Sequence, residues 1–374
     1  MYYSDLKDFL EIINKIKDCK IFIVGAGTNG VLLGNFFNKN HISYEGYVDK
    51  KNIQDVEGKK VLSYKSINPS FKYYYIISSF INRNEMYKAL KEQGISDDYI
   101  IDTANRNFSV AIYEQIFDVH KYINRIKNFK NKYLGQRCFI IGNGPSLMIS
   151  DLNNLLKEKT FACNTIWPVY DHTKWRPFFY CVQDPCECSV IIKDNTLLKM
   201  LLDNCSFFFT NIRSKIALKC RDLELQKMFF YRGRVMADGE KEFSDNAYEV
   251  LFISGTITFI MIQLAVYMGF KDIYLLGIDF SFTQEHHDDG SITSNDVDNH
   301  NSLIEEEEEK LRISDEIQNM YGSGYFVDYD KQLRGYQAAK KYADTHGIKI
   351  YNATRGGKLE VFPRVDFDSL FEKS

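Results

Sequence analysis

Several features that mark specialised classes of protein are scarce or missing in this sequence. Only six prolines are spread over 374 residues, and the two halves are not close repeats of each other. Lys and Arg number 47 against 50 Asp and Glu, which gives a net charge of −3. A general nucleic-acid binder would carry a basic excess. The composition therefore excludes nucleic acid as the expected partner.

Long uninterrupted apolar runs are also missing. The N-terminus reads Met-Tyr-Tyr-Ser-Asp, without the basic segment and apolar core of a secretion signal. The most apolar stretch, residues 251–269, contains Ser254, Thr256, Thr258 and Gln263. This stretch favours a buried core helix over a membrane span. We expect a cytoplasmic protein.

The eight cysteines have no regular spacing, and four of them lie inside apolar runs. These four are Cys138, Cys163, Cys181 and Cys205. The pattern is typical of reduced thiols in a protein core. Cys181, Cys186 and Cys188 lie close together, but no second pair follows at the spacing of a zinc site. We predict no metal site from the cysteines.

The chain length suggests two domains, since a domain usually has about 100–200 residues. Short apolar strands alternate with helical patterns twice along the chain, which predicts parallel sheets. The expected fold class is α/β, with two Rossmann-like parallel-sheet domains joined by a helical connector. The expected parts are residues 1–103, a connector at 104–134 rich in Lys and Asn, and a second domain at 135–374.

Individual elements follow from the same patterns. In the first part the predicted strands are 20–24, 42–48, 61–62, 73–77 and 99–101, with helices at 1–19, after Gly30 through Phe37, and at 82–94. In the second part the predicted strands are 137–141, 160–163, 178–182, 206–210, 272–276 and 348–351, with helices at 255–268 and 336–345. The polar stretch 284–301 is predicted to be a long loop, and such loops are commonly functional or disordered.

The first part contains the glycine pattern of dinucleotide-binding folds. Gly25, Gly27 and Gly30 follow a strand and open a helix, and Asp49 ends the next strand about 20 residues on. Such glycines let a pyrophosphate approach the backbone, and the acid accepts hydrogen bonds from a ribose. A bound nucleotide and a purely scaffolding role both stay open, because the domain is only about half the size of a complete dinucleotide fold.

In the second part, five polar segments fall where strands end or helices begin. They are residues 142–147, 161–164, 180–185, 254–256 and 277–279. In an open parallel sheet, ligands bind at the carboxyl ends of the strands. Any one segment could be a simple turn, but the five together predict a ligand site.

These segments resemble two related families over roughly residues 135–366. Gly142-Asn-Gly-Pro-Ser-Leu147, Cys163-Asn164 and the run from Ile253-Ser-Gly-Thr to Gly277-Ile-Asp-Phe280 resemble the bacterial sialyltransferases of glycosyltransferase family 42. The ending Gly347–Thr354 through Leu359–Arg364 resembles the MptE-like family. That family includes archaeal hydroxymethyldihydropterin pyrophosphokinases and bacterial motility-associated factors that glycosylate flagellin with nonulosonic acids.

The resemblance implies a site for a CMP-activated sugar. The residues expected to face the nucleotide are Asn143, Gly144, Ser146 and Asn164. The residues expected near the phosphate or the donor sugar are Ser254, Gly255 and Thr256. Asp184 occupies a place where the sialyltransferases have a polar residue before proline.

The general base is where this sequence departs from the sialyltransferases, which have a histidine shortly before their last helix. Residues 325–330 read Tyr-Phe-Val-Asp-Tyr-Asp instead. The catalytic candidates are therefore His286 or His287 in the polar loop, Asp328 or Asp330, and Asp279. A base must come within hydrogen-bond distance of the acceptor hydroxyl, so the sequence leaves the choice among them open.

The expected activity is transfer of a nonulosonic or sialic-acid-like sugar from a CMP-activated donor to a surface glycan or glycolipid. No cofactor is required for that reaction. The alternatives are a pyrophosphokinase of the MptE type, which would need Mg²⁺ on ATP, and a non-catalytic nucleotide-binding protein. Asp279 and the run His286-His-Asp-Asp289 are the residues that such a metal would use. Peripheral contact with the inner face of the membrane and self-association also stay open.

Overall fold

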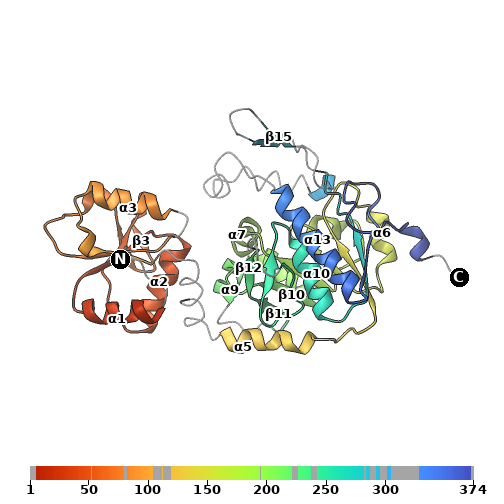
Figure 1. The fold of residues 1–374 in the computed structure, drawn as a ribbon, viewed down its shortest axis with the longest axis horizontal. Coiled ribbons are helices and arrows are strands. Elements are labelled where there is room, and N and C mark those ends of the chain that lie inside the picture. Colours follow the sequence, from red (N-terminus) through yellow and green to blue (C-terminus); the bar gives the residue numbers. More distant parts are fainter. Residues whose placement is uncertain are drawn as a thin grey trace. The chain divides into compact units, whose positions relative to one another are not determined.

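The chain forms two compact units, Met1–Val119 and His120–Ser374, and each is described by itself. The computed structural model (Figure 1) describes residues 6–51, 53–79, 82–103, 112, 119–193, 195–220, 226–236, 242–281, 284–286, 292–294, 301–304 and 328–371. The division between the units falls inside the predicted connector, most of which lies outside the described residues. The boundaries at 103 and 134 stay predictions.

The first unit is built on a sheet in which five parallel strands take the order β4-β2-β1-β5-β6, with β3 antiparallel to β4 at the edge. Chain progression reverses between β1 and β5, which makes this point the topological switch of the sheet. Its helices are α1 Leu6–Ile16, α2 Thr28–Lys39 and α3 Arg83–Glu92, with short 3₁₀ turns η1 Tyr64–Ser66 and η2 Asp97–Tyr99. Its strands are β1 Ile21–Val24, β2 Gly46–Val48, β3 Asp55–Val56, β4 Lys59–Leu62, β5 Tyr74–Ile77 and β6 Ile100–Asp102.

The second unit is built on a sheet of seven strands, all parallel, in the order β11-β10-β9-β8-β7-β14-β17. Three of these strands, β8, β9 and β11, are buried along their whole length, which is what helices on both faces of a parallel sheet produce. The chain moves outward from β7 through β8 to β11 and then returns to β7's other side with β14. The switch point of this sheet therefore lies between β7 and β14.

The strands of the second unit are β7 Arg137–Ile141, β8 Thr160–Cys163, β9 Phe179–Val182, β10 Phe207–Asn211, β11 Met228–Tyr231, β14 Asp272–Leu276 and β17 Lys349–Asn352. Two further pairs are parallel β12 Gly233–Val235 with β13 Leu251–Ile253, and antiparallel β15 Gln284–His286 with β16 Ile292–Ser294. The helices are α5 Val119–Asn124, α6 Ile149–Asn154, α7 Pro185–Lys193, α8 Asn195–Asp203, α9 Lys215–Cys220, α10 Ile257–Tyr267 and α13 Tyr329–Thr345. The 3₁₀ turns are η3 Arg125–Phe129, η4 Trp167–Asp171 and η5 Asp368–Leu370.

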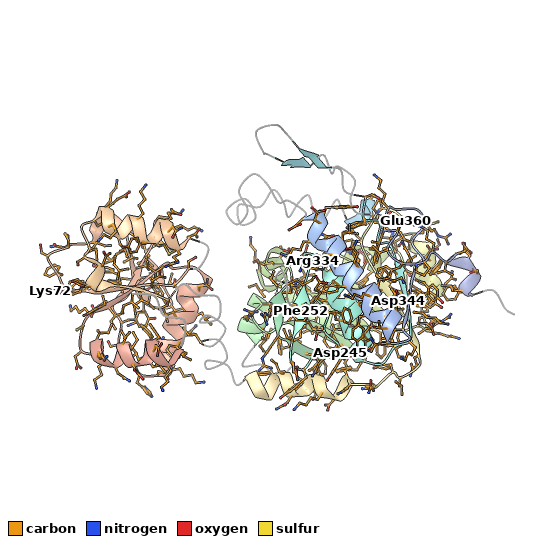
Figure 2. All side chains as sticks on the ribbon, viewed as in Figure 1. Lys72, Asp245, Phe252, Arg334, Asp344 and Glu360 are labelled. Atoms are coloured by element: carbon orange, nitrogen blue, oxygen red, sulfur yellow. The ribbon has the colours of Figure 1, made fainter. Side chains whose placement is uncertain are left out.

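Helix α10 is the buried helix that the sequence predicted. Every residue from Thr258 to Tyr267 is buried, and the helix packs beside β13 and α13. It contains one amide side chain, Gln263, which is fully buried. The oxygen of Gln263 accepts the amide protons of Ser244 and Phe252, at 3.1 and 3.0 Å, and its nitrogen donates to the carbonyl of Phe252 at 2.8 Å. The Gln263 side chain thus forms hydrogen bonds with backbone groups of the segment before the helix. Phe252 and Asp245 of this segment are labelled in Figure 2.

Most predicted elements are confirmed, and four are corrected. The helix predicted after Gly30 begins at Thr28, and the helix predicted at 336–345 begins at Tyr329, where Asp328 caps it. The strand predicted at 42–48 is limited to 46–48, because the register of β1 pairs only these residues, Phe22 with Gly46 through Val24 with Val48. The loop predicted at 284–301 contains the paired strands β15 and β16, whose β-branched Ile292 and Thr293 suit a hairpin. The fold class with two Rossmann-like parallel-sheet units is confirmed. The four cysteines predicted to be core residues are all buried.

We expect Gln263→Met to destabilise the second unit by about 3 kcal/mol, because the isosteric apolar chain leaves three buried backbone groups without partners. Both tryptophans, Trp167 and Trp175, lie in the second unit, so the midpoint of tryptophan fluorescence in urea reports on that unit alone. The matched control is Gln136→Met, since the Gln136 side chain is exposed. Equal midpoints for the two variants would contradict the role assigned to Gln263.

Candidate functional site

The turn after β7 and the turn after β14 meet at the switch point of the seven-stranded sheet. The amide of Gly144 donates to the carbonyl of Gly277 at 2.9 Å, so the two backbones are in direct contact. A side chain at position 144 would overlap the carboxylate of Asp279. Glycine is therefore required for the approach of the two turns, and two of the predicted ligand segments are brought together.

Asp279 holds the first turn in place. Its Oδ2 accepts a hydrogen bond from Ser146 Oγ at 2.8 Å, and the Ser146 amide lies 3.4 Å from the same oxygen. Asp279 is only 9% exposed, and its carbonyl accepts the amide proton of Lys358 at 2.6 Å. Hydrogen bonds to an ionised carboxylate are stronger than neutral ones. The two residues predicted for substrate binding and catalysis thus bind each other.

Asn143 and Asn164 lie at the ends of the neighbouring strands β7 and β8. Asn143 Nδ2 donates to the carbonyl of Cys163 at 3.3 Å, and the Asn143 side chain is 8% exposed. Asn164 has φ +45°, a conformation that asparagine tolerates better than most residues. Among the described residues, Asn143 Oδ1 and Asn164 Oδ1 are buried and accept no hydrogen bond. Both carboxamides remain where the sequence predicted them, at one edge of the sheet.

The segment 254–256 lies between β13 and α10. Ser254 is fully buried, and within the described part of the chain its hydroxyl has no hydrogen-bond partner. Thr256 caps α10, its Oγ1 accepting the amide proton of Thr258 at 3.2 Å. The carbonyl of Gly255, a residue with φ +82°, accepts a hydrogen bond from Gln332 Nε2 of α13 at 3.1 Å. Helix α13 thus fixes the start of α10.

Two residues of α13 that the sequence analysis did not select complete this part of the site. Gly335 faces Ser254 so closely that a side chain at 335 would overlap the Ser254 hydroxyl. Tyr336 has side-chain hydrogen bonds with Thr256 and Thr258 and is fully buried. Burial raises the pKa of Tyr336 to about 12, although these hydrogen bonds act in the opposite direction. The phenol therefore stays protonated at neutral pH.

Tyr336 also connects the start of α10 with the end of β14. Its ring packs edge-on against Phe280, with centroids 5.6 Å apart, and Phe280 directly follows Asp279.

Asn301 holds the turn after β7 through two hydrogen bonds. Its backbone amide donates to the carbonyl of Asn143 at 2.7 Å, and its Nδ2 donates to the carbonyl of Leu147 at 2.7 Å. Nothing in the pattern of the polar loop distinguishes Asn301 from its neighbours.

Asp184 precedes α7 and is half-buried, and its carbonyl accepts the amide proton of Cys188 at 2.9 Å. One turn further on, Glu187 Oε1 accepts a hydrogen bond from the buried Thr165 at 2.8 Å. Thr165 follows Asn164, so α7 carries two carboxylates to the edge of the sheet where the carboxamides lie. The sequence analysis selected Asp184 and missed Glu187, which the Asp-Pro helix start could have indicated.

The candidates for a general base are placed unequally. Asp328 is exposed and caps α13, accepting the amide proton of Lys331 at 3.0 Å. His286 is the last residue of β15, and only its backbone is described. His287 lies outside the described residues, and Asp279 is bound to Ser146. The identity of the base stays a prediction.

In the first unit, the glycine turn lies at the switch point between β1 and β5. Asp49 Oδ2 accepts the amide proton of Ala26 at 2.7 Å, and Oδ1 accepts that of Lys51 at 2.9 Å. Gly30 lies directly against the carbonyl of Gly25, and Gly27 precedes the first residue of α2. The acid that the glycine pattern assigns to a ribose thus binds the glycine turn itself. Nucleotide binding at Gly25, Gly27, Gly30 and Asp49 stays a prediction.

Two further findings concern metals and membranes. Within the ranges that the structure describes, no group of three or more His, Cys, Asp or Glu side chains is arranged to hold a metal ion. The run His287–Asp289 lies outside those ranges. Among the described helices, none has the length and apolar character needed to cross a membrane.

Comparison with known proteins identifies the family that the central segment resembles. Residues 111–285 match the family model described as 6-hydroxymethylpterin diphosphokinase MptE-like. The matched segment is somewhat less than half of the chain. The resemblance to the MptE-like family that the sequence motifs indicated is thus confirmed for this segment. No curated protein sequence matches the chain.

Solved structures with similarity to this chain include two kinds of glycosyltransferase. The MAf glycosyltransferase from Magnetospirillum magneticum AMB-1 is 14% identical, with all of this chain and 64% of that chain covered and a TM-score of 0.41. The sialyltransferase CstII from Campylobacter jejuni, in complex with cytidine-5′-monophosphate, is 16% identical, with 62% and 85% covered and a TM-score of 0.36. A CST-II complex with a trisaccharide acceptor and CMP is 15% identical, with 61% and 85% covered and a TM-score of 0.35.

This chain therefore spans a little less than two thirds of the Magnetospirillum structure. With identities near 15% and TM-scores below 0.5, none of these similarities defines an activity for this chain.

The contact between Ser146 and Asp279 predicts an energetic coupling of about 2 kcal/mol, the usual size for a hydrogen bond to a charged group. A double-mutant cycle with Ser146→Ala and Asp279→Ala, followed by tryptophan fluorescence in urea, measures it. Ser150→Ala in the same cycle is the control, because Ser150 is exposed. Additive effects of Ser146→Ala and Asp279→Ala would show that the hydrogen bond does not hold the turn.

Proposed function

We propose that the second unit is a glycosyltransferase, which transfers a nonulosonic or sialic-acid-like sugar from a CMP-activated donor to a glycan or glycolipid acceptor. One observation carries the proposal: Asn143 Oδ1, Asn164 Oδ1 and Ser254 Oγ are buried polar atoms that find no partner within the described residues. A buried polar atom without a hydrogen bond costs about 1–3 kcal/mol. A ligand that binds at this edge of the sheet would remove that cost.

The chemistry of these atoms suits a nucleoside. The hydrogen bond from Asn143 Nδ2 to the carbonyl of Cys163 sets the orientation of the carboxamide. Oδ1 is therefore the atom of this group that can bind a ligand. A carboxamide oxygen only accepts hydrogen bonds, and so its ligand must donate. Ribose hydroxyls and the amino group of cytosine donate, whereas phosphate oxygens do not. We infer that Asn143 and Asn164 bind the nucleoside part of the donor.

The start of α10 suits the phosphate. The helix has 11 residues, and its first amide groups and positive dipole end favour an anion. The hydroxyl of Ser254 lies just before this helix start and can donate to a phosphate oxygen. In the reaction, the acceptor hydroxyl oxygen bonds to the anomeric carbon, the bond from that carbon to the phosphate oxygen breaks, and CMP leaves with the electron pair. Donors at the start of α10 would stabilise the charge on that leaving group.

A base must take the proton of the acceptor hydroxyl. The hydrogen bonds of Asp279 to Ser146 favour a positioning role for this carboxylate. Of the remaining candidates, we propose His286 or His287, because an unperturbed imidazole titrates near pH 6.5 and accepts a proton at neutral pH. Asp328 or Asp330 is the alternative; Asp328 already caps α13, and Asp330 is exposed in its first turn.

A second function is favoured by the family model over residues 111–285, whose description is a diphosphokinase. In that case the same edge of the sheet would bind ATP, with Mg²⁺ held by Asp279 and the carboxylates or imidazoles of the run 286–289. The two functions differ in their need for the metal, since CMP carries a single phosphate and Mg²⁺ usually bridges several. A non-catalytic nucleotide-binding protein would bind either ligand without turnover.

We expect the purified chain to bind CMP in isothermal titration calorimetry with the same affinity in Mg²⁺ and in EDTA. Asn143→Ala should weaken CMP binding about 10- to 100-fold, the loss expected for one or two ligand hydrogen bonds. Asn128→Ala, an exposed asparagine of the same unit, is the control. Binding of ATP only in the presence of Mg²⁺, with no binding of CMP, would replace the transferase with the diphosphokinase.

The choice of base gives a separate prediction for the pH profile. With a neutral imidazole as base, kcat/KM of sugar transfer should fall about tenfold per pH unit below the pKa of that histidine. Either His286→Gln or His287→Gln should abolish this acidic limb and lower kcat while CMP affinity is retained. His346→Gln is the control, because His346 lies after the end of α13 at the opposite edge of the sheet. An unchanged profile in both histidine variants would leave Asp328 or Asp330 as the base.

A further inference from the structure

The edge of the seven-stranded sheet opposite the candidate site has a charge unlike that of the chain as a whole. Residues 119–150 contain six Lys and Arg and no Asp or Glu, whereas the chain has a net charge of −3. This segment includes α5 and η3 and enters the sheet at the first residue of β7. Figure 1 shows α5 along the lower side of the second unit and β15 above its upper side.

All seven strands are parallel, so the loops that precede them gather at the same edge. These loops add further basic residues to those of the segment before β7. We call the exposed lysines at this edge the basic face: Lys127, Lys130, Lys132, Lys157, Lys174 and Lys227. Of the acidic residues in these loops, Glu158 and Asp203 form ion pairs with Arg137 and Lys199, at 2.6 and 2.5 Å, so their charges are largely compensated. The segments before β9 and β11 also contain Asp171, Asp222 and Glu224.

Two exposed leucines lie among these lysines. Leu134 is 67% exposed and Leu156 is 55% exposed, which is unusual for large aliphatic side chains. They belong to the loops before β7 and β8, which are neighbouring strands, and the ion pair of Arg137 with Glu158 joins these two loops. Large apolar groups on a surface with polar surroundings commonly mark an interaction site.

Two lysines of the basic face lie over aromatic rings. The ammonium group of Lys127 lies 3.8 Å from the centroid of the Tyr248 ring, and that of Lys132 lies 5.1 Å from the Phe129 ring. Phe129 is itself buried against the rings of Phe207 and Phe229, with centroids 4.9 and 4.8 Å away. Lys127 and Lys132 thus rest on aromatic rings, and the ring under Lys132 belongs to a packed aromatic cluster.

Basic residues around exposed aliphatic side chains match the surface of an anionic bilayer, in which lysines meet phosphate headgroups and leucines enter the acyl boundary. A single-stranded nucleic acid would require exposed aromatic rings for base stacking. The large exposed apolar residues described on this face are leucines. We propose that the basic face docks the protein peripherally onto a membrane rich in anionic phospholipid.

This docking is independent of the reaction at the candidate site. It would direct the carboxyl edge of the sheet away from the bilayer, by at least the length of a five-residue strand, or about 17 Å. If the proposed transfer takes place, the acceptor hydroxyl must therefore be presented at that height above the membrane surface.

The test is flotation of the full chain with vesicles of phosphatidylcholine alone, or mixed with about one third phosphatidylglycerol, at low and high salt. We expect binding to the mixed vesicles, loss of binding in high salt, and little binding to phosphatidylcholine. Each lysine near an anionic surface adds roughly fivefold to the affinity, so Lys127→Gln, Lys130→Gln and Lys132→Gln together should weaken binding about 100-fold. Leu134→Ser with Leu156→Ser should weaken it as well.

Control variants remove three lysine charges, or one large exposed apolar side chain, from the first unit. Lys65→Gln, Lys72→Gln and Lys88→Gln change three exposed lysines of the first unit, and Phe71→Ser removes a side chain that is 52% exposed. Equal losses in the control variants, no binding to mixed vesicles, or tight binding to duplex DNA without binding to vesicles would each overturn the proposal. Tryptophan fluorescence verifies folding, and CMP titration, which measures the site alone, separates failure of the docking face from failure of the proposed function.

Discussion

The contact between the turn after β7 and the turn after β14 is the constraint on which the candidate site depends. Gly144 lets the backbones touch, and Asp279 binds Ser146 across the gap. The two turns follow the neighbouring strands β7 and β14, at the switch point of the sheet. Open parallel sheets bind their ligands at this point, next to the backbone of the turns. Because the two turns are fixed, the Asn143 carboxamide is held at the carboxyl edge of the sheet, and its Oδ1 can still accept a hydrogen bond.

Helix α13 contributes the opposite wall, although it is more than 180 residues away along the chain. Its residues Gln332, Gly335 and Tyr336 contact the start of α10 at Gly255, Ser254 and Thr256. The site is therefore assembled from three separate stretches of sequence, each delivered to the edge by a different strand or helix. Such an arrangement suits a ligand with chemically distinct parts, because a nucleoside and its phosphate can be bound by different elements.

The two edges of the seven-stranded sheet differ in character for a topological reason. In an all-parallel sheet, every loop before a strand lies at one edge and every loop after a strand lies at the other. The buried polar atoms of Asn143, Asn164 and Ser254 lie at the carboxyl edge together with several carboxylates, whereas exposed lysines and two exposed leucines lie at the amino edge. A ligand site and a docking face can therefore occupy one unit without competing for surface.

The sequence alone determined the alternation of strands and helices, the buried helix α10 and the order of the polar turns, because these depend on local hydrophobic pattern and on glycine at defined places. It did not determine the use of each polar group. Ser146 and Asp279 were both expected to face substrate, and only tertiary structure paired them; Asp49 likewise binds the glycine turn of its own unit. Tyr336 and Gly335 carried no local signal, since their role arises from contacts between distant segments, whereas the Asp-Pro helix start could have indicated Glu187. Strand order, which places these contacts at a switch point, is decided by packing of the whole sheet and cannot be obtained from the pattern of any single strand.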